Sequence, residues 1–158
     1  MLYAASISTP ANTSASAPLS SRIIMTPGLI YHVELYFPPG SCGLLHVQLF
    51  DSAYQVCPAS PGESLCGDNV LLRYDEMYMH GEAPFIVEVK TWNVDTEYDH
   101  GCEVRIALVS KEEYIARFMP SMQTGMVEEV LAKVEGEQTA KKEKALAALR
   151  SRLRYFGE

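Results

Sequence analysis

The stretch LIYHVELYF, residues 29–37, decides the fold of this chain. Two polar residues, His32 and Glu34, stand between apolar ones. This period of two is typical of a β-strand that buries one face in a hydrophobic core. The turn-forming residues 38–40, Pro-Pro-Gly, predict that the strand ends directly after it. The residues that we expect on its buried face are Leu29, Tyr31, Val33, Leu35 and Phe37.

Strand candidates of the same kind occur on both sides of this stretch. Turn-forming residues separate them, and no helical pattern lies between them. Because parallel sheets need helical crossovers, about eight short strands predict an antiparallel β-sandwich of the jelly-roll or a related Greek-key type. The other candidates span residues 3–7, 20–26, 45–49, 54–57, 70–74, 85–92 and 102–108. The core residues that we expect are Tyr31, Val33, Leu35, Val47, Leu49, Val87, Val89, Val104 and Ile106.

The periodicity becomes helical after Leu108. Residues 111–118 predict a short helix that Pro120 ends, and residues 126–156 contain no proline. One apolar stripe in this segment comprises Val127, Val130, Leu131 and Val134, and another comprises Leu146, Leu149, Leu153 and Phe156. Residues 135–144 between the stripes are polar on all sides. We therefore expect a C-terminal α-helical arm that stands apart from its own sandwich and packs on another subunit.

This pattern divides the chain into three parts. They are an extended N-terminal strand or arm over residues 1–19, a β-sandwich domain over residues 20–110 and a helical C-terminal arm over residues 111–158. The residues of the arm that we expect to contact another subunit or a partner are Val127, Val130, Leu131, Val134, Leu146, Leu149, Arg150, Leu153, Arg154 and Phe156.

Charge is distributed unevenly along the chain. Residues 1–110 carry four basic and twelve acidic side chains, net −8, whereas residues 138–158 carry six basic and two acidic ones, net +4. The end of the arm is therefore complementary to an acidic sandwich, either its own or that of a neighbour. Lys and Arg on the solvated side of an amphipathic helix give the same pattern, so both interpretations stay open.

The composition disfavours several classes of protein. Thirteen Lys and Arg against twenty Asp and Glu leave a net charge of −7, which argues against a general nucleic-acid binder. No apolar run approaches the roughly 20 residues that cross a bilayer. The first charged side chain is Arg22, so the basic segment of a secretory signal is not evident. We expect no direct contact with nucleic acid or membrane.

Motifs for catalysis or metal binding are absent from the sequence. It lacks a G-x-S-x-G elbow, an H-E-x-x-H pair and a phosphate-binding glycine loop. Residues 95–99, DTEYD, match a calcium loop weakly, because His100 stands where the loop requires glycine. We expect no catalytic residue, no metal and no cofactor. The four cysteines are expected to be free thiols, with a disulfide between Cys57 and Cys66 as the alternative.

Several turns and core positions together resemble those of a known group of proteins. It is the group of small β-sandwich, jelly-roll-like virion proteins of tailed bacteriophages, of the type that decorates or cements capsids. The resemblance covers about residues 20–119 and does not include the C-terminal helix. The matching positions are Tyr31-x-Val33-Glu34-x-x-Phe37-Pro38-Pro39-Gly40, Gly43-Leu44, Val47 to Asp51, Ser60-Pro61-Gly62-Glu63, Gly67-Asp68-Asn69, Asn93, Asp95, Tyr98, His100 and Val104-Arg105-Ile106.

The resemblance implies a non-enzymatic structural protein of the virion, made in the host cytoplasm. Its partners would be further copies of itself, in a homo-oligomer, and a major capsid or other virion protein. Two alternatives stay open. A carbohydrate-binding sandwich would place Tyr74, Tyr78 and Trp92 in one exposed cleft. A cupin-like metalloenzyme would bring together several carboxylates and the histidines, which are His32, His46, His80 and His100.

Overall fold

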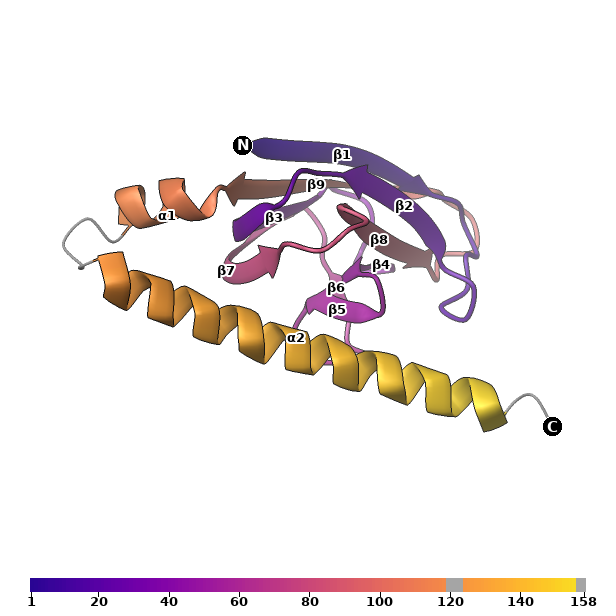
Figure 1. Cartoon of the computed structure of the whole chain (residues 1–158). Coiled ribbons are helices and arrows are strands. Elements are labelled where there is room, and N and C mark those ends of the chain that lie inside the picture. The colour runs from indigo at the N-terminus through magenta and orange to yellow at the C-terminus, as the bar shows by residue number, and fades with distance from the viewer. Residues whose placement is uncertain (119–123, 156–158) are drawn as a thin grey trace.

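The computed structural model describes residues 1–118 and 124–155 (Figure 1). In this part of the chain, a run of strands precedes two helices. The strands are β1 (Leu2–Thr9), β2 (Leu19–Ile24), β3 (Gly28–Phe37), β4 (Leu45–Asp51), β5 (Tyr54–Cys57), β6 (Leu65–Cys66), β7 (Val70–His80), β8 (Ile86–Asn93) and β9 (His100–Val109). The helices are α1 (Lys111–Phe118) and α2 (Thr124–Tyr155).

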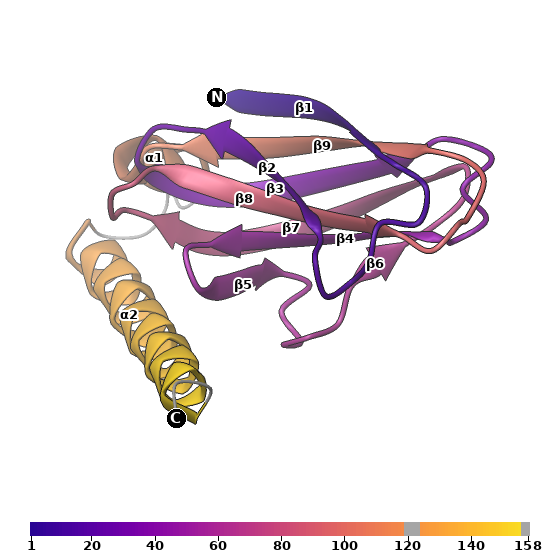
Figure 2. The ribbon, with the colours of Figure 1, turned by 90° about the vertical axis from the view of Figure 1, so that its right-hand side faces the viewer.

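The strands form two antiparallel sheets that face each other (Figure 2). One sheet has the order β1-β9-β3-β7, and the other has the order β2-β8-β4-β5, with β6 paired to β4. The antiparallel partners are nested along the chain: β1 with β9, β2 with β8, β3 with β7 and β4 with β5. This nesting is the topology of a jelly roll. The predicted fold class, a mainly β antiparallel sandwich followed by a C-terminal helix, is confirmed.

The core between the sheets contains the predicted residues with one exception. Val33, Leu35 and their predicted counterparts in β4, β8 and β9 are at most 2% exposed. Tyr31 was expected beside them but is half-buried, so this prediction is wrong. A bulge between Ile30 and His32 shifts the pairing of β3 with both neighbours. One extra residue reverses the alternation, and Ile30 takes the inward position instead.

Strand β7 is longer than predicted. The alternation in the sequence ends at Tyr74, but the strand continues through Asp75 and Glu76 to His80. Asp75 Oδ1 lies 2.8 Å from Nδ1 of His32 on the neighbouring strand β3. Acidic residues are more common in loops than in strands, but here a cross-strand partner stabilises them on the outer face of the sheet.

The N-terminal strand belongs to the sandwich. Residues 2–9 pair with β9 along their whole length and form one edge of the first sheet. The first helix begins with a capping box, because the N–H of Glu113 donates to Oγ of Ser110 and the N–H of Ser110 donates to Oε2 of Glu113. Neither helix, over the residues described, combines the length and apolar character that crossing a membrane requires.

The cysteines are all free thiols, as expected, and no disulfide joins Cys57 to Cys66. Cys57 and Cys102 are buried, whereas Cys42 and Cys66 are exposed. Burial raises the pKa of Cys57 to about 11 and that of Cys102 to about 12. The two buried thiols therefore stay protonated at neutral pH and act as small apolar side chains of the core.

Candidate functional site

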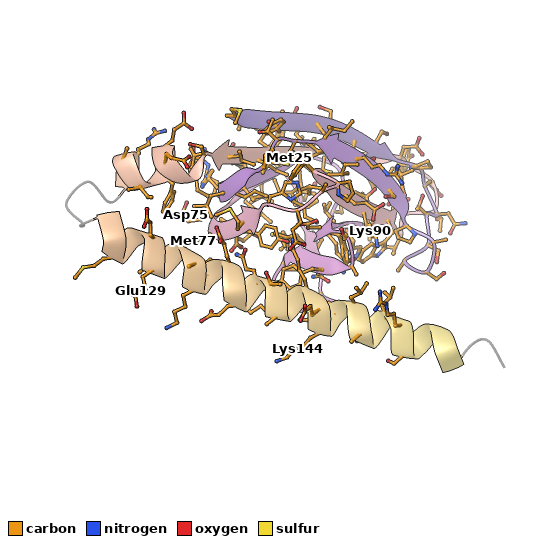
Figure 3. All side chains as sticks on the ribbon, viewed as in Figure 1. Met25, Asp75, Met77, Lys90, Glu129 and Lys144 are labelled. Carbon is orange, nitrogen blue, oxygen red and sulfur yellow. The ribbon has the colours of Figure 1, made fainter. Side chains whose placement is uncertain are left out.

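Helix α2 lies along one side of the sandwich, against β5 and β7, and both of its ends extend past these strands (Figure 1). Figure 3 shows Met77 of β7 above the helix and Glu129 on the far side of it. The sequence predicts that the polar middle of this helix has no partner on its own sandwich. The structure differs, because the polar middle is the part that contacts the sandwich.

The first polar contact joins Gln138 to the edge of β7. Nε2 of Gln138 donates to the backbone carbonyl of Met77 at 2.8 Å, and the backbone N–H of Met79 donates to Oε1 of Gln138 at 2.8 Å. The other edge of β7 pairs with β3. The side-chain amide of Gln138 therefore replaces a peptide group of a neighbouring strand and satisfies part of a sheet edge.

The second contact lies one turn further along the helix, where Lys142 reaches a buried carboxylate. Its Nζ lies 2.9 Å from Oδ2 of Asp51, a residue at the end of β4 that is 2% exposed. The hydroxyl of Tyr78 donates to the same oxygen at 2.7 Å, and Nδ1 of His80 lies 3.2 Å from it. Side chains from β4, β7 and α2 thus meet at one oxygen atom, which fixes the helix on both sheets.

Protonation at this cluster follows from burial and hydrogen bonding. Burial alone would raise the pKa of Asp51, but hydrogen bonds from His80, Lys142 and Tyr78 outweigh burial and hold that pKa far below its usual range. Burial and the hydrogen bond to Asp51 raise the pKa of Tyr78 well above its ordinary value. At neutral pH the cluster therefore contains an Asp51 carboxylate and a neutral Tyr78 donor.

The helical spacing explains why Gln138 and Lys142 point toward the sandwich. Steps of three and four residues connect Val134, Gln138, Lys142, Ala145 and Leu149 along one helix face. Val134 of the first apolar stripe and Leu149 of the second therefore lie on this single face. Two polar side chains interrupt it and bond to the sheets. The spacing of residues 134–149 is the signal in the sequence for these contacts, although polar residues on a helix are usually solvated.

The predicted contact residues lie in α2, apart from Phe156, which is outside the described residues. The structure describes the helical backbone but not the side chains of Val127, Leu131, Leu153 and Arg154. Val134 is half-buried and Arg150 is exposed. The apolar residues Val130, Leu146 and Leu149 are 39%, 40% and 48% exposed. Apolar surface therefore remains accessible on both sides of the anchored middle of the helix.

An open groove of about 750 Å³ lies beside Leu149, between α2 and the sandwich. Its lining is mostly apolar and includes two lysines at the helix. The residues that line it include Phe50, Tyr54 and Pro61 of the sandwich and Lys141, Lys144, Ala145, Ala148 and Leu149 of α2. A third cation lies nearby, since Nζ of Lys90 is 4.1 Å from the centre of the Phe50 ring. Such a groove suits an apolar protein segment that carries carboxylates.

The histidines named as metal-ligand candidates lie in separate parts of the molecule. Each has its own partner: His32 contacts Asp75, His46 contacts Ser64, His80 contacts Asp51, and His100 contacts Asp95. Among the residues described, no three metal-binding side chains lie close enough together to hold a metal ion.

The residues of the other two candidate sites, the calcium loop and the carbohydrate-binding cleft, also contact residues within the chain. Oδ1 of Asp95 accepts the backbone N–H of Glu97 at 2.8 Å, and Oδ2 of Asp95 lies 2.9 Å from Nε2 of His100, as in a closed hairpin loop. Of the three aromatic residues, Tyr78 is 3% exposed and Tyr74 packs against the core from β7. Trp92 stacks on His46 on the other sheet. These three residues do not form one cleft.

One chain among the solved structures is similar to this chain. A chain in the structure described as the cyanophage Pam1 capsid asymmetric unit is similar to this chain, with a TM-score of 0.41 and 15% sequence identity. The similarity covers 67% of this chain and 81% of that chain. No family model matches the sequence. No curated protein matches it.

Proposed function

We propose that this chain is a non-enzymatic structural protein of a tailed-bacteriophage virion. In this role it acts as a capsid decoration or cement protein, and α2 binds a major capsid or other virion protein. The jelly-roll fold is common to viral capsid proteins, lectins and cupins, so the fold does not choose among them. Two observations support the virion role: the resemblance over residues 20–119 and the anchoring of α2 on the sandwich.

The observation that carries this proposal is that α2 is anchored at one place and exposes apolar side chains at another. Gln138 and Lys142 bond to β7 and to Asp51. Leu146 and Leu149 follow within two turns and remain 40% and 48% exposed, and Leu149 lines the groove. Exposed apolar side chains on a fixed helix are typical of a protein contact. Each contributes roughly 1.5 to 3 kcal/mol when it is fully buried.

The two alternatives have less support from the residues described. The carbohydrate-binding interpretation needs Tyr74, Tyr78 and Trp92 in one exposed cleft, but Tyr78 is buried and Trp92 lies on the other sheet. The cupin interpretation needs histidines that converge, and each of them instead contacts a different side chain. Neither interpretation accounts for the exposed apolar residues of α2.

The test is an add-back experiment with particles of the phage that encodes the chain, prepared without it. Purified wild-type protein should bind these particles at a fixed stoichiometry, measured by quantitative mass spectrometry of sedimented particles. The double variant Leu146→Asp/Leu149→Asp should remain folded, because the anchors at Gln138 and Lys142 are intact. We expect it to lose most of its particle occupancy, since two apolar contacts become charged.

The matched control is Ala147→Asp, which adds a carboxylate on an exposed position between the two leucines. It should bind like the wild type. Equal occupancy of the double variant and the wild type would contradict the proposal. Point variants are preferable to deletion of residues 124–158, because that deletion also removes Gln138 from β7 and Lys142 from Asp51.

A further inference from the structure

The edge strand β1 lies on the side of the sandwich opposite α2 (Figure 2). It pairs with β9, and the sheet order ends at β1. The adjacent edge of the second sheet is β2, which pairs with β8. Among the residues described, no helix or further strand pairs with this edge of β1.

The pairing register shows which backbone groups of β1 face outward. The N–H of Leu108 donates to the carbonyl of Met1 at 2.8 Å, and the amino group of Met1 contacts the carbonyl of Leu108. In an antiparallel pair such mutually bonded positions recur every second residue. The odd-numbered residues of β1 therefore bond to β9. The N–H and C=O groups that point away from β9 are those of Leu2, Ala4, Ser6 and Ser8, which are all exposed.

This edge has none of the features that protect edge strands from pairing with other chains. Such features are charged side chains, proline, bulges and very short strands. β1 has eight residues in continuous register with β9, and it contains no charge and no proline. Side chains on the neighbouring strand are neutralised by ion pairs, since Arg105 contacts Glu103 at 2.6 Å and Glu34 at 3.4 Å.

We propose that β1 binds the β1 strand of a second copy of this chain in antiparallel orientation. The two four-stranded sheets would then form one continuous sheet across a two-fold axis at Ala5. In this register Leu2 lies opposite Ser8 of the partner subunit, and Ala4 lies opposite Ser6 of the partner subunit. All four outward-facing residues of each copy then exchange backbone hydrogen bonds with the other.

The β1 edge is a place where a second copy of this chain meets no like charge, and its uncharged sequence is complementary to itself in antiparallel orientation. The chain carries a net charge of −7, so two copies repel each other over most of their surfaces. Residues 1–21 carry no charged side chain, and β1 lies within them. Its outward residues are also small or uncharged, so the same strand fits opposite itself without a clash of like charges. This surface is separate from α2, and the inference does not depend on the proposed function.

The experiment measures the mass of the full chain in solution by size-exclusion chromatography with light scattering. The wild type should have twice the 17.5 kDa mass of the chain. Ser6→Pro removes an outward N–H and leaves the bonds to β9 intact, since proline is tolerated at such edge positions. This variant should have the mass of one chain. Ser20→Pro makes the matched change on the β2 edge and should leave the dimer mass unchanged.

A second pair of variants tests the register without proline. Ala4→Glu/Ser6→Glu places like charges opposite each other across the two-fold axis and should give monomers. Ala4→Glu/Ser6→Lys places opposite charges there and should retain the dimer. Thermal unfolding confirms that each variant is folded. A wild-type mass of 17.5 kDa at the highest soluble concentration overturns the inference. A dimer that persists in both Ser6→Pro and Ala4→Glu/Ser6→Glu overturns it equally.

Discussion

The two long sides of the sandwich differ in what lies against their edge strands. On the β5 and β7 side, α2 supplies Gln138 to the backbone of β7 and Lys142 to buried Asp51. On the β1 and β2 side, no described strand or helix pairs with the outward backbone groups of β1. Unpaired strand edges favour association with other chains. One side of this protein is therefore closed by its own helix, while the other is available to a second chain.

The core that both sides share should give the largest effect. Val33→Asp should prevent folding, because an unpaired buried carboxylate costs several kcal/mol against a total stability of roughly 5 to 15 kcal/mol. Tyr31→Asp should fold with reduced stability, since Tyr31 is half-buried at the bulge. Circular dichroism and thermal unfolding distinguish the two. Equal effects would show that the bulge does not turn Tyr31 away from the core.

Loss of the buried anion on the closed side should have the next largest effect. Asp51→Asn leaves Lys142 without its carboxylate, and breaking a buried pair in this way costs about 3 to 5 kcal/mol. Denaturant unfolding measures the change in the free energy of unfolding. Glu143→Gln, an exposed neighbour on α2, is the control and should change stability by less than about 0.5 kcal/mol.

The closed side should also respond to acid in a defined direction. The pKa of Asp51 is lower in the folded protein than its ordinary value of 3.8, so the folded state binds this proton less readily than the unfolded state. Its stabilising contribution is therefore complete above pH 3.8 and falls as the pH drops toward the lower folded pKa. The stability difference between wild type and Asp51→Asn should shrink as the pH falls below 3.8. A difference that grows with acid would contradict this assignment.

Removal of the amide that caps β7 should have a smaller effect. Gln138→Ala leaves the N–H of Met79 and the carbonyl of Met77 without their protein partner. Each buried unsatisfied group costs about 1 to 3 kcal/mol, and solvent that reaches the edge reduces this cost. Hydrogen exchange at the Met79 amide should become faster. Glu137→Ala, at the exposed preceding position, should leave that exchange rate unchanged.

The smallest effect is expected on the open side. Ile24 of β2 is 75% exposed, so Ile24→Lys should change the free energy of unfolding by less than about 0.5 kcal/mol. Chemical denaturation at low and high protein concentration measures it. A loss above about 1 kcal/mol that appears only at high concentration would show that β2, as well as β1, is covered in the associated protein.

Much of the fold follows from local patterns in the sequence. Alternation predicted the strands because each strand has one face in the core, and turn residues predicted their ends. Tyr31 was misplaced because a bulge depends on pairing with two neighbouring strands, β7 and β9, which the sequence of β3 does not contain. The extension of β7 was missed for a similar reason, since Asp75 has a cross-strand partner in His32.

The sequence shows one part of the candidate site, and the role of its apolar residues as partner contacts stays a prediction. The sequence identified Leu146 and Leu149 as apolar residues without a place in the core, and both are exposed. It did not identify Gln138 and Lys142, because polar residues on a helix are usually solvated. Their role depends on a strand edge and a carboxylate that lie far away in the sequence, at Met77 and Asp51.

The sequence by itself determined the antiparallel sandwich, the terminal helices and the excess of negative charge on the strands, because these depend on local periodicity and composition. The tertiary structure alone decided which sheet edges are closed. Pairing partners, and the position of α2 along β5 and β7, are set by contacts between residues distant in the chain. Closing a sheet edge stabilises the fold only when the edge strand and the segment that covers it are in contact. The sequence of either segment alone therefore does not predict which edge is closed.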